Sequence, residues 1–249
     1  MRKPVMAGNW KMYKTPAETR AFFETFRPLV ERAEHCEIVI CPPFPNLPAA
    51  TEAAARTRIQ IGAQNLYWAK EGAFTGEVSG PMIRATGATH VIIGHSERRQ
   101  YFGETNETVL KKTKAALEAG LKPIVCVGER LEEREAGKTQ AVLCEQCQAG
   151  IAGLEPREFA QIVIAYEPVW AIGTGKVATP EMAGEAHRVI RDQARTRYGD
   201  EAANQVRILY GGSVKPDNVK SLMAQPEVDG VLVGGASLDP ASFASIVHF

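Results

Sequence analysis

The chain has 249 residues, 45% of them hydrophobic and 23% charged, and its formal net charge at pH 7 is zero. This length and composition fit one large α/β domain, and the balanced charge excludes recruitment of nucleic acid or a membrane by an overall electrostatic field. No apolar run approaches the roughly 20 residues of a membrane-spanning helix, and the first residues lack the apolar core of a signal peptide. We therefore expect a cytoplasmic protein that attracts an anionic ligand only through local charge.

The five cysteines are Cys36, Cys41, Cys126, Cys144 and Cys147. An odd count in a chain of this size indicates reduced thiols. Cys144 and Cys147 lie one turn apart in a helical stretch, without a second pair that could complete a zinc site. We interpret them as free thiols and not as a redox or metal centre.

Short strand-like runs alternate with helical stretches along the whole chain. The strands are expected at residues 5–9, 37–41, 59–63, 90–93, 124–127, 161–166, 206–210 and 231–233. The helices are expected at residues 15–33, 48–55, 81–86, 105–119, 139–152, 179–198, 216–223 and 240–247. Eight strand–helix repeats without a hairpin signal favour a closed α/β barrel, (β/α)8, as a single domain over residues 1–249. A doubly wound open sheet is the alternative, but no dinucleotide fingerprint follows the first strand.

Glu167 directly follows the sixth strand, where packing gives no reason for a carboxylate. Pro168 and the bulky pair Val169-Trp170 restrict the backbone that follows. The segment Ile172-Gly173-Thr174-Gly175 then supplies two glycines whose amides can approach a ligand closely. This pattern predicts an acid at a strand end, followed by a stiffly hinged lid. A surface loop with an incidental glutamate is the alternative.

Asn9 and Lys11 stand at the end of the first strand, on the same side of an extended segment. In a barrel, this end of the strands carries the chemistry. The lysine would give the mouth of the barrel the positive charge that the whole chain lacks. A lysine exposed on a loop is the alternative.

His95 follows the fourth strand and precedes an expected helix start at Ser96. The positive end of a helix dipole disfavours imidazolium, so a neutral ring there could donate a hydrogen bond to a substrate oxygen. A histidine that only caps the helix is the alternative. His90 is separated from His95 by an odd number of residues, so the two rings should face opposite sides of an extended strand and should not share a metal.

Two glycine pairs stand at the last two strand ends, in Gly211-Gly212-Ser213 and in Gly234-Gly235. Backbone amides in such turns can surround a phosphate, and barrels often bind phosphate in these two units. The alternative is that both pairs are merely tight corners.

The third strand leads into a long connection, residues 64–79, that contains Leu66, Tyr67, Trp68 and Phe74. So many apolar side chains in a Gly-rich loop indicate burial, most simply against a second subunit. Packing against its own barrel is the alternative.

At this point the motifs show that the chain resembles the triosephosphate isomerase family from end to end. The segments that carry the resemblance are Gly8-Asn9-Trp10-Lys11, Gly94-His95-Ser96-Glu97-Arg98, Ala165-Tyr166-Glu167-Pro168-Val169-Trp170-Ala171-Ile172-Gly173-Thr174-Gly175, Tyr210-Gly211-Gly212-Ser213 and Val233-Gly234-Gly235-Ala236. The resemblance implies a TIM barrel that interconverts dihydroxyacetone phosphate and D-glyceraldehyde 3-phosphate through an enediol(ate), in glycolysis and gluconeogenesis. This family is also a standard example of acid–base tuning and lid closure.

The resemblance further implies a role for each matching residue. Glu167 is the general base, neutral His95 the electrophile, and Lys11 the positive charge near the carbonyl oxygen and the phosphate. Asn9 helps to hold that oxygen and Lys11. Glu97 stands behind Lys11, and two roles stay open for it: pairing with the lysine or relaying protons. The amides that bind phosphate come from Gly173, Ser213, Gly234 and Gly235.

The resemblance implies neither a cofactor nor a metal. It implies a homodimer in which the tip of the loop, near Phe74-Thr75-Gly76, enters the neighbouring subunit close to Asn9 and Lys11. Two competing functions differ in single features. Another barrel enzyme for sugar phosphates would share the glycine pairs without Glu167 and its lid, and a non-catalytic phosphate-binding barrel would tolerate the loss of Glu167 or His95.

Overall fold

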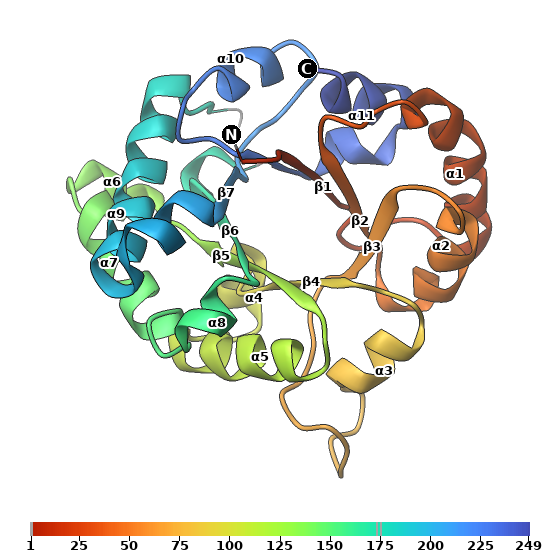
Figure 1. Ribbon diagram of the computed structural model, residues 1–249, viewed down its shortest axis with the longest axis horizontal. Coiled ribbons are helices and arrows are strands. Elements are labelled where there is room, and N and C mark those ends of the chain that lie inside the picture. The colour runs from red at the N-terminus through yellow and green to blue at the C-terminus, as the bar shows by residue number, and fades with distance from the viewer. Residues whose placement is uncertain (1, 173, 175) are drawn as a thin grey trace.

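The computed structural model describes residues 2–172, 174 and 176–249. Within these residues, eight parallel strands pair in sequence order and close into a barrel in which β8 lies beside β1. Helices surround the barrel as an outer ring (Figure 1). The prediction of a closed (β/α)8 TIM barrel is therefore confirmed.

The strands are β1 (Val5–Asn9), β2 (Glu37–Cys41), β3 (Ile59–Ala63), β4 (His90–Ile93), β5 (Lys122–Val127), β6 (Val163–Tyr166), β7 (Arg207–Tyr210) and β8 (Gly230–Val233). The helices are α1 (Pro16–Val30), α2 (Leu47–Ala54), α3 (Gly80–Ala85), α4 (Ser96–Tyr101), α5 (Asn106–Glu118), α6 (Leu131–Glu135), α7 (Thr139–Gly150), α8 (Pro156–Phe159), α9 (Pro180–Gln205), α10 (Val219–Met223) and α11 (Pro240–Val247). None of the helices that the structure describes is long and apolar enough to cross a membrane.

The boundaries follow the local signals closely. Thr15 caps α1 with its side chain, and Glu18 returns a bond to the backbone of Thr15, which completes the capping box. α9 consists of two helical segments: the first ends before Gly199, as expected from the predicted end at residue 198, and a second, unpredicted segment continues to Gln205. Gly199 has a φ of 85°, so the chain turns there and then resumes helical geometry. The short helices α6 and α8 were not predicted, because a single turn leaves no clear periodicity.

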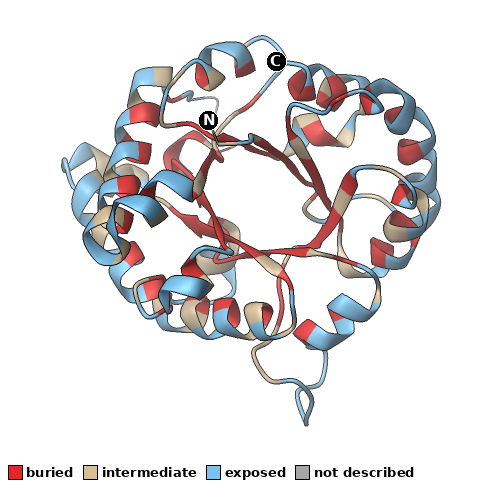
Figure 2. Cartoon of the chain, viewed as in Figure 1, coloured by how far each residue is buried: buried red, intermediate tan, exposed pale blue. Residues whose placement is uncertain are grey.

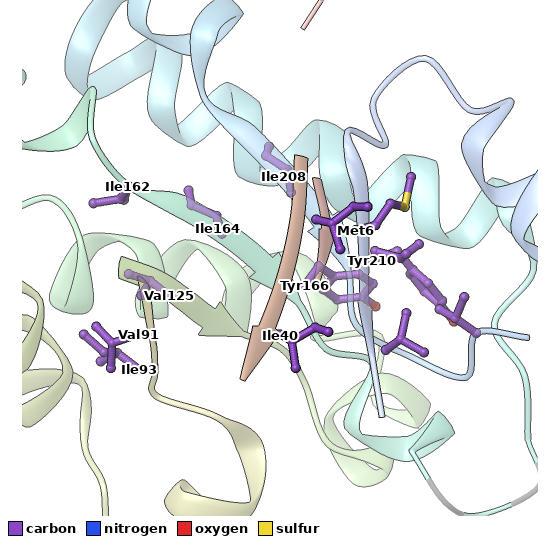
Figure 3. Packing of buried hydrophobic residues seen from close by; sticks show 14 of the residues in the cluster. Met6, Ile40, Val91, Ile93, Val125, Ile162, Ile164, Tyr166, Ile208 and Tyr210 are labelled. Carbon is purple, nitrogen blue, oxygen red and sulfur yellow. The ribbon is translucent and has the colours of Figure 1, made fainter. Parts of the chain in front are cut away.

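Strand residues alternate between two cores. Inward-facing side chains fill the barrel, among them Val163, Ala165 and Leu209. Their neighbours face outward and pack under the helices, as Ile164, Tyr166 and other labelled residues do in Figure 3. Figure 2 shows the strands as the most continuously buried part of the chain. This period of two directs the residue that follows Tyr166, the carboxylate Glu167, back toward the barrel axis.

The lower, N-terminal end of the barrel is filled by an ion-pair network. Glu37 Oε2 lies 2.7 Å from Arg207 Nη1, and Oε1 lies 3.1 Å from His90 Nε2 and 3.2 Å from Lys122 Nζ. The bond to His90 and the two cations hold the pKa of Glu37 well below its usual range. Burial lowers the pKa of His90. Charged groups thus occupy this end, whereas the opposite end is open to a ligand.

Because His187 in α9 is buried, we expect the unfolding free energy of the protein to fall at acidic pH. Burial lowers its pKa to about 3, and its Nδ1 lies 3.1 Å from the carbonyl oxygen of Glu227. An unfolded histidine has a pKa of about 6.5, so between these values the unfolded chain binds more protons and stability rises with pH. Below pH 6.5 the wild type should lose unfolding free energy through this group at up to about 1.4 kcal/mol per pH unit. His187→Gln should remove this contribution and make the decline less steep.

Denaturant titrations at several pH values would measure both slopes. His248→Gln, a change of the same kind at an exposed ring, is the control and should keep the wild-type slope. Equal slopes for the wild type and His187→Gln would contradict the prediction.

Candidate active site

A cavity of about 290 Å³ opens at the C-terminal end of the barrel. Its lining residues are Asn9, Lys11, His95, Glu167, Ile172, Gly211, Gly212, Ser213, Val214, Lys215, Leu232, Gly234, Gly235 and Ala236. The structure therefore brings most of the residues that the sequence singled out to one place. Gly173 lies outside the described residues. Lys215, which the sequence analysis missed, adds a second lysine to the lining.

Glu167 faces this cavity while being 2% exposed. Its Oε1 lies 2.9 Å from His95 Nε2, and its Oε2 accepts a hydrogen bond of 2.9 Å from the backbone N–H of Ser96. The hydroxyl of Ser96 donates to Oε1 over 3.3 Å. Burial favours the neutral acid, but His95 and the Ser96 amide outweigh burial and lower the pKa of Glu167. The group is thus a carboxylate at neutral pH although it is almost completely buried.

His95 is the N-cap residue of α4, and this helix starts at Ser96 as the sequence predicted. The backbone N–H of Glu97 donates to His95 Nδ1 over 3.2 Å, a bond that requires the lone pair of a neutral ring. The ring proton then sits on Nε2 and points at Glu167. Burial disfavours the imidazolium, but the Glu167 carboxylate overcomes burial and raises the pKa of His95. Once that carboxylate turns to a substrate, burial and the helix N-terminus both favour the neutral ring.

The expectation that His90 and His95 face opposite sides is wrong, because the extended strand ends before His95. β4 stops at Ile93, and Gly94 adopts a φ of 74°. This left-handed residue interrupts the alternation and turns His95 into the cavity. His90 contacts Glu37 in the network at the lower end of the barrel. The two rings therefore lie at opposite ends of the barrel.

Lys11 has a φ of 53°, which is unusual for a residue with a side chain. The Asn9 side chain accepts a bond of 3.0 Å from its N–H, and the Gln64 amide donates to its carbonyl oxygen over 2.8 Å. Lys11 Nζ lies 2.5 Å from Glu97 Oε1. Of the two roles left open for Glu97, the geometry thus favours pairing with Lys11. The sequence shows no sign of this role of Gln64, because no motif marks a side-chain amide that binds the backbone of Lys11.

Glycine is needed in the two pairs for different physical reasons. A Cβ on Gly212 would stand 2.3 Å from the Tyr210 hydroxyl and 2.9 Å from Pro168, so the protein's own packing requires glycine there. A Cβ on Gly235 would meet nothing within 4 Å, and one on Gly234 would meet Lys11 Cε at 3.5 Å. The second pair therefore leaves open space in the cavity, which suits close approach of a ligand to the backbone.

Glu129 is a completely buried carboxylate that the sequence analysis also missed. Its Oε1 accepts hydrogen bonds from Trp170 Nε1 over 2.9 Å and from the Tyr166 hydroxyl over 3.1 Å. Its carbonyl oxygen accepts from the N–H of Val169 over 3.1 Å. Glu129 thus holds the first residues after Glu167 in their present position. Only the folded chain shows this role, because Glu129 and Trp170 come from different loops.

Comparison with known proteins agrees with this geometry. The family model described as triosephosphate isomerase matches residues 4–249. A triosephosphate isomerase from Solibacter usitatus is 74% identical over the full length of both chains. Enzymes of the same name from Citrifermentans bemidjiense and Moorella thermoacetica are 59% and 56% identical, over 100% of this chain and 99% of theirs. With a whole-length family match and these identities, the chain belongs to the triosephosphate isomerase family.

Proposed function

We propose that Glu167 is the general base with which this member of the family interconverts dihydroxyacetone phosphate and D-glyceraldehyde 3-phosphate, an isomerisation of glycolysis and gluconeogenesis. One observation carries the assignment. The buried carboxylate of Glu167 and the Nε2 atom of the His95 imidazole lie 2.9 Å apart and face one cavity beside Lys11. A base and a hydrogen-bond donor in this arrangement suit proton abstraction next to a carbonyl group.

The chemistry follows from the same contacts. A bound substrate offers its carbonyl oxygen to the Nε2–H of His95, which releases the Glu167 carboxylate. Glu167 then removes a proton from the carbon beside the carbonyl, and negative charge develops on the oxygen. His95 and Lys11 stabilise that charge, with Asn9 holding the lysine backbone. A proton also moves from the substrate hydroxyl to the former carbonyl oxygen, which makes the hydroxyl carbon the new carbonyl. Glu167 finally returns its proton to the former carbonyl carbon, so the reaction needs no cofactor or metal.

The phosphate of the substrate should bind at the open glycine pair. Gly234, Gly235 and Ser213 line the cavity, and Gly173 of the lid would add an amide from the other side. Lys11 lies next to Gly234, where its charge serves both the phosphate and the carbonyl oxygen. In this assignment Glu97 sets the position of Lys11 through their ion pair.

A coupled assay on purified protein tests the whole assignment. Both triose phosphates should be converted, and a chelator should leave the rate unchanged. A barrel enzyme for another sugar phosphate would be inhibited by inorganic phosphate but would not isomerise trioses. A binding protein would show phosphate affinity without turnover.

We also propose a cytoplasmic homodimer, with residues 1–249 of each subunit forming one domain. The loop between β3 and α3 projects from the barrel (Figure 1). Leu66 packs into its own barrel, but Phe74 at the tip is 44% exposed. Met12 and Phe102, on the connections that follow β1 and β4, are 92% and 68% exposed. The loop tip and the surface near Met12 and Phe102 are both exposed and apolar, which supports insertion of the tip into a second subunit.

Phe74→Asp, or shortening of the tip at residues 74–76, should give monomers with poor activity. A charge at the tip opposes burial in an apolar interface, and Lys11 would lose the support of the neighbouring subunit. Sedimentation at micromolar concentration and the isomerisation rate would measure the two effects. Leu29→Asp is the control, because Leu29 is equally exposed, at 44%, on the outer face of α1. An intact protein that sediments as a fully active monomer would rule out the dimer.

A further inference from the structure

The backbone of Glu167 rests directly on Gly128, the residue after β5. A Cβ added to Gly128 would lie 1.7 Å from the carbonyl oxygen of Glu167 and 2.6 Å from its carbonyl carbon. No side chain fits between these two backbones. Glu167 is also tied to this segment by its N–H, which donates to the carbonyl oxygen of Val127 over 2.8 Å. The position of Gly128 therefore decides where the backbone of Glu167 lies.

Gly128 is held in turn by one side chain from α7. Its N–H donates to Gln146 Oε1 over 2.7 Å, and its carbonyl oxygen accepts from Gln146 Nε2 over 3.0 Å. Among the described residues, no other group hydrogen-bonds to these two backbone atoms. A primary amide can accept from the N–H and donate to the C=O of one residue at the same time, because its oxygen and nitrogen are separate atoms.

The helix that carries Gln146 is firmly packed. Two neighbours of Gln146 in α7 are buried in the outer core. They are Leu143, in the preceding turn, and Cys147, the next residue. A separate cavity of about 340 Å³ is lined by Gly128, Gln146 and Glu167 among others. Gly128 has this open space beside it, and the two hydrogen bonds from Gln146 oppose a shift into it.

We propose that Gln146 is a positioning residue for the isomerisation: through its two hydrogen bonds to Gly128 it fixes the backbone of Glu167, and so the distance from which the carboxylate meets the substrate. The proposal rests on the assignment of Glu167 as the base. Gln146 is not among the residues that line the substrate cavity, so its effect should fall on turnover and not on phosphate binding.

Gln146→Leu removes both hydrogen bonds at similar volume. We expect kcat to fall about 10- to 100-fold, since displacement of a reacting group by about 1 Å can cost about 100-fold. KM and the inhibition constant of inorganic phosphate should change by less than about threefold, because the residues proposed to bind the phosphate, Ser213, Gly234 and Gly235, stay in place. Gln146→Glu keeps an acceptor for the Gly128 N–H, so its kcat should lie between those of Gln146→Leu and the wild type. Its added negative charge should move the acid limb of the kcat/KM profile to higher pH.

Gln148→Leu, the same change at an exposed position of α7, is the control and should keep the wild-type kcat. A Gln146→Leu protein with unchanged kcat and a lowered melting temperature would overturn the proposal and leave Gln146 a structural residue. A raised KM with unchanged kcat would overturn it as well. If Gln146→Leu does not fold, Gln146→Glu decides, and wild-type kcat with an unshifted acid limb would refute the proposal.

The same series separates this proposal from the function on which it rests. A wild type without isomerase activity would refute the proposed function itself. A Glu167→Asp variant as fast as the wild type would overturn the role of Glu167 and the role of Gln146 together. An active wild type, a slow Glu167→Asp and a fast Gln146→Leu would overturn the role of Gln146 alone.

Discussion

Glu167→Asp is expected to lower kcat by about 100-fold or more, while KM changes little. The substitution withdraws the carboxylate by one methylene, a displacement of about 1 Å, and proton transfer depends steeply on that distance. The backbone cannot move forward to compensate, because Val127 and Gly128 hold it. In the proposed assignment other residues bind the phosphate, so ground-state binding should survive. Steady-state kinetics in both directions would measure the effect.

Glu185→Asp is the matched control, since Glu185 is exposed on α9 and loses the same methylene far from the cavity. It should keep the wild-type rate. Turnover close to that of the wild type in Glu167→Asp would remove Glu167 from the proton transfer. A large rise in KM with unchanged kcat would instead make Glu167 a binding residue.

Deletion of residues 172–175 is expected to abolish most isomerisation and to divert substrate to methylglyoxal and inorganic phosphate. An enediolate phosphate can expel its phosphate, so the site must hold this group until the second proton transfer. Ile172 lines the cavity, and Thr174 donates a hydrogen bond of 2.7 Å to the carbonyl oxygen of Trp170. Gly173 and Gly175 lie outside the described residues. A surface loop carries little of the core, so the barrel should still fold.

Both sets of products can be measured in one incubation, beside the wild type and a blank without protein. Thermal unfolding would check that the deletion variant remains folded. Slow isomerisation without a larger share of elimination would show that the lid contributes to binding only, and protection of the intermediate would have to be abandoned.

The fold could be predicted because its signals are local and repeated. Each strand of the barrel is a short apolar run, and caps such as Thr15 mark helix starts within the sequence. In α9 the non-helical backbone of Gly199 ends the first helical segment near the predicted end at residue 198, and only the short segment that follows was not predicted. Each strand pairs with the next strand along the chain, so the strand order of the barrel follows from the strand–helix repeat alone.

The candidate site was predictable where a residue stands at a strand end within a motif. Asn9, Lys11, His95 and Glu167 all meet in the cavity. Gln64, Glu129 and Gln146 were not predictable in the same way. Each acts on a residue far away in sequence through one or two hydrogen bonds, and neither composition nor periodicity records such a contact.

The alternation of β6 and the end of that strand, both written in the sequence, determined by themselves that Glu167 faces the mouth of a barrel. Only the tertiary structure decided what holds this carboxylate and keeps it ionised. The buried imidazole of His95 and the Ser96 amide lower its pKa, and Gly128 fixes its backbone. The reason is physical: the direction of a strand side chain depends on its neighbours in the chain, whereas its pKa and position depend on groups that only the closed barrel brings within hydrogen-bonding distance.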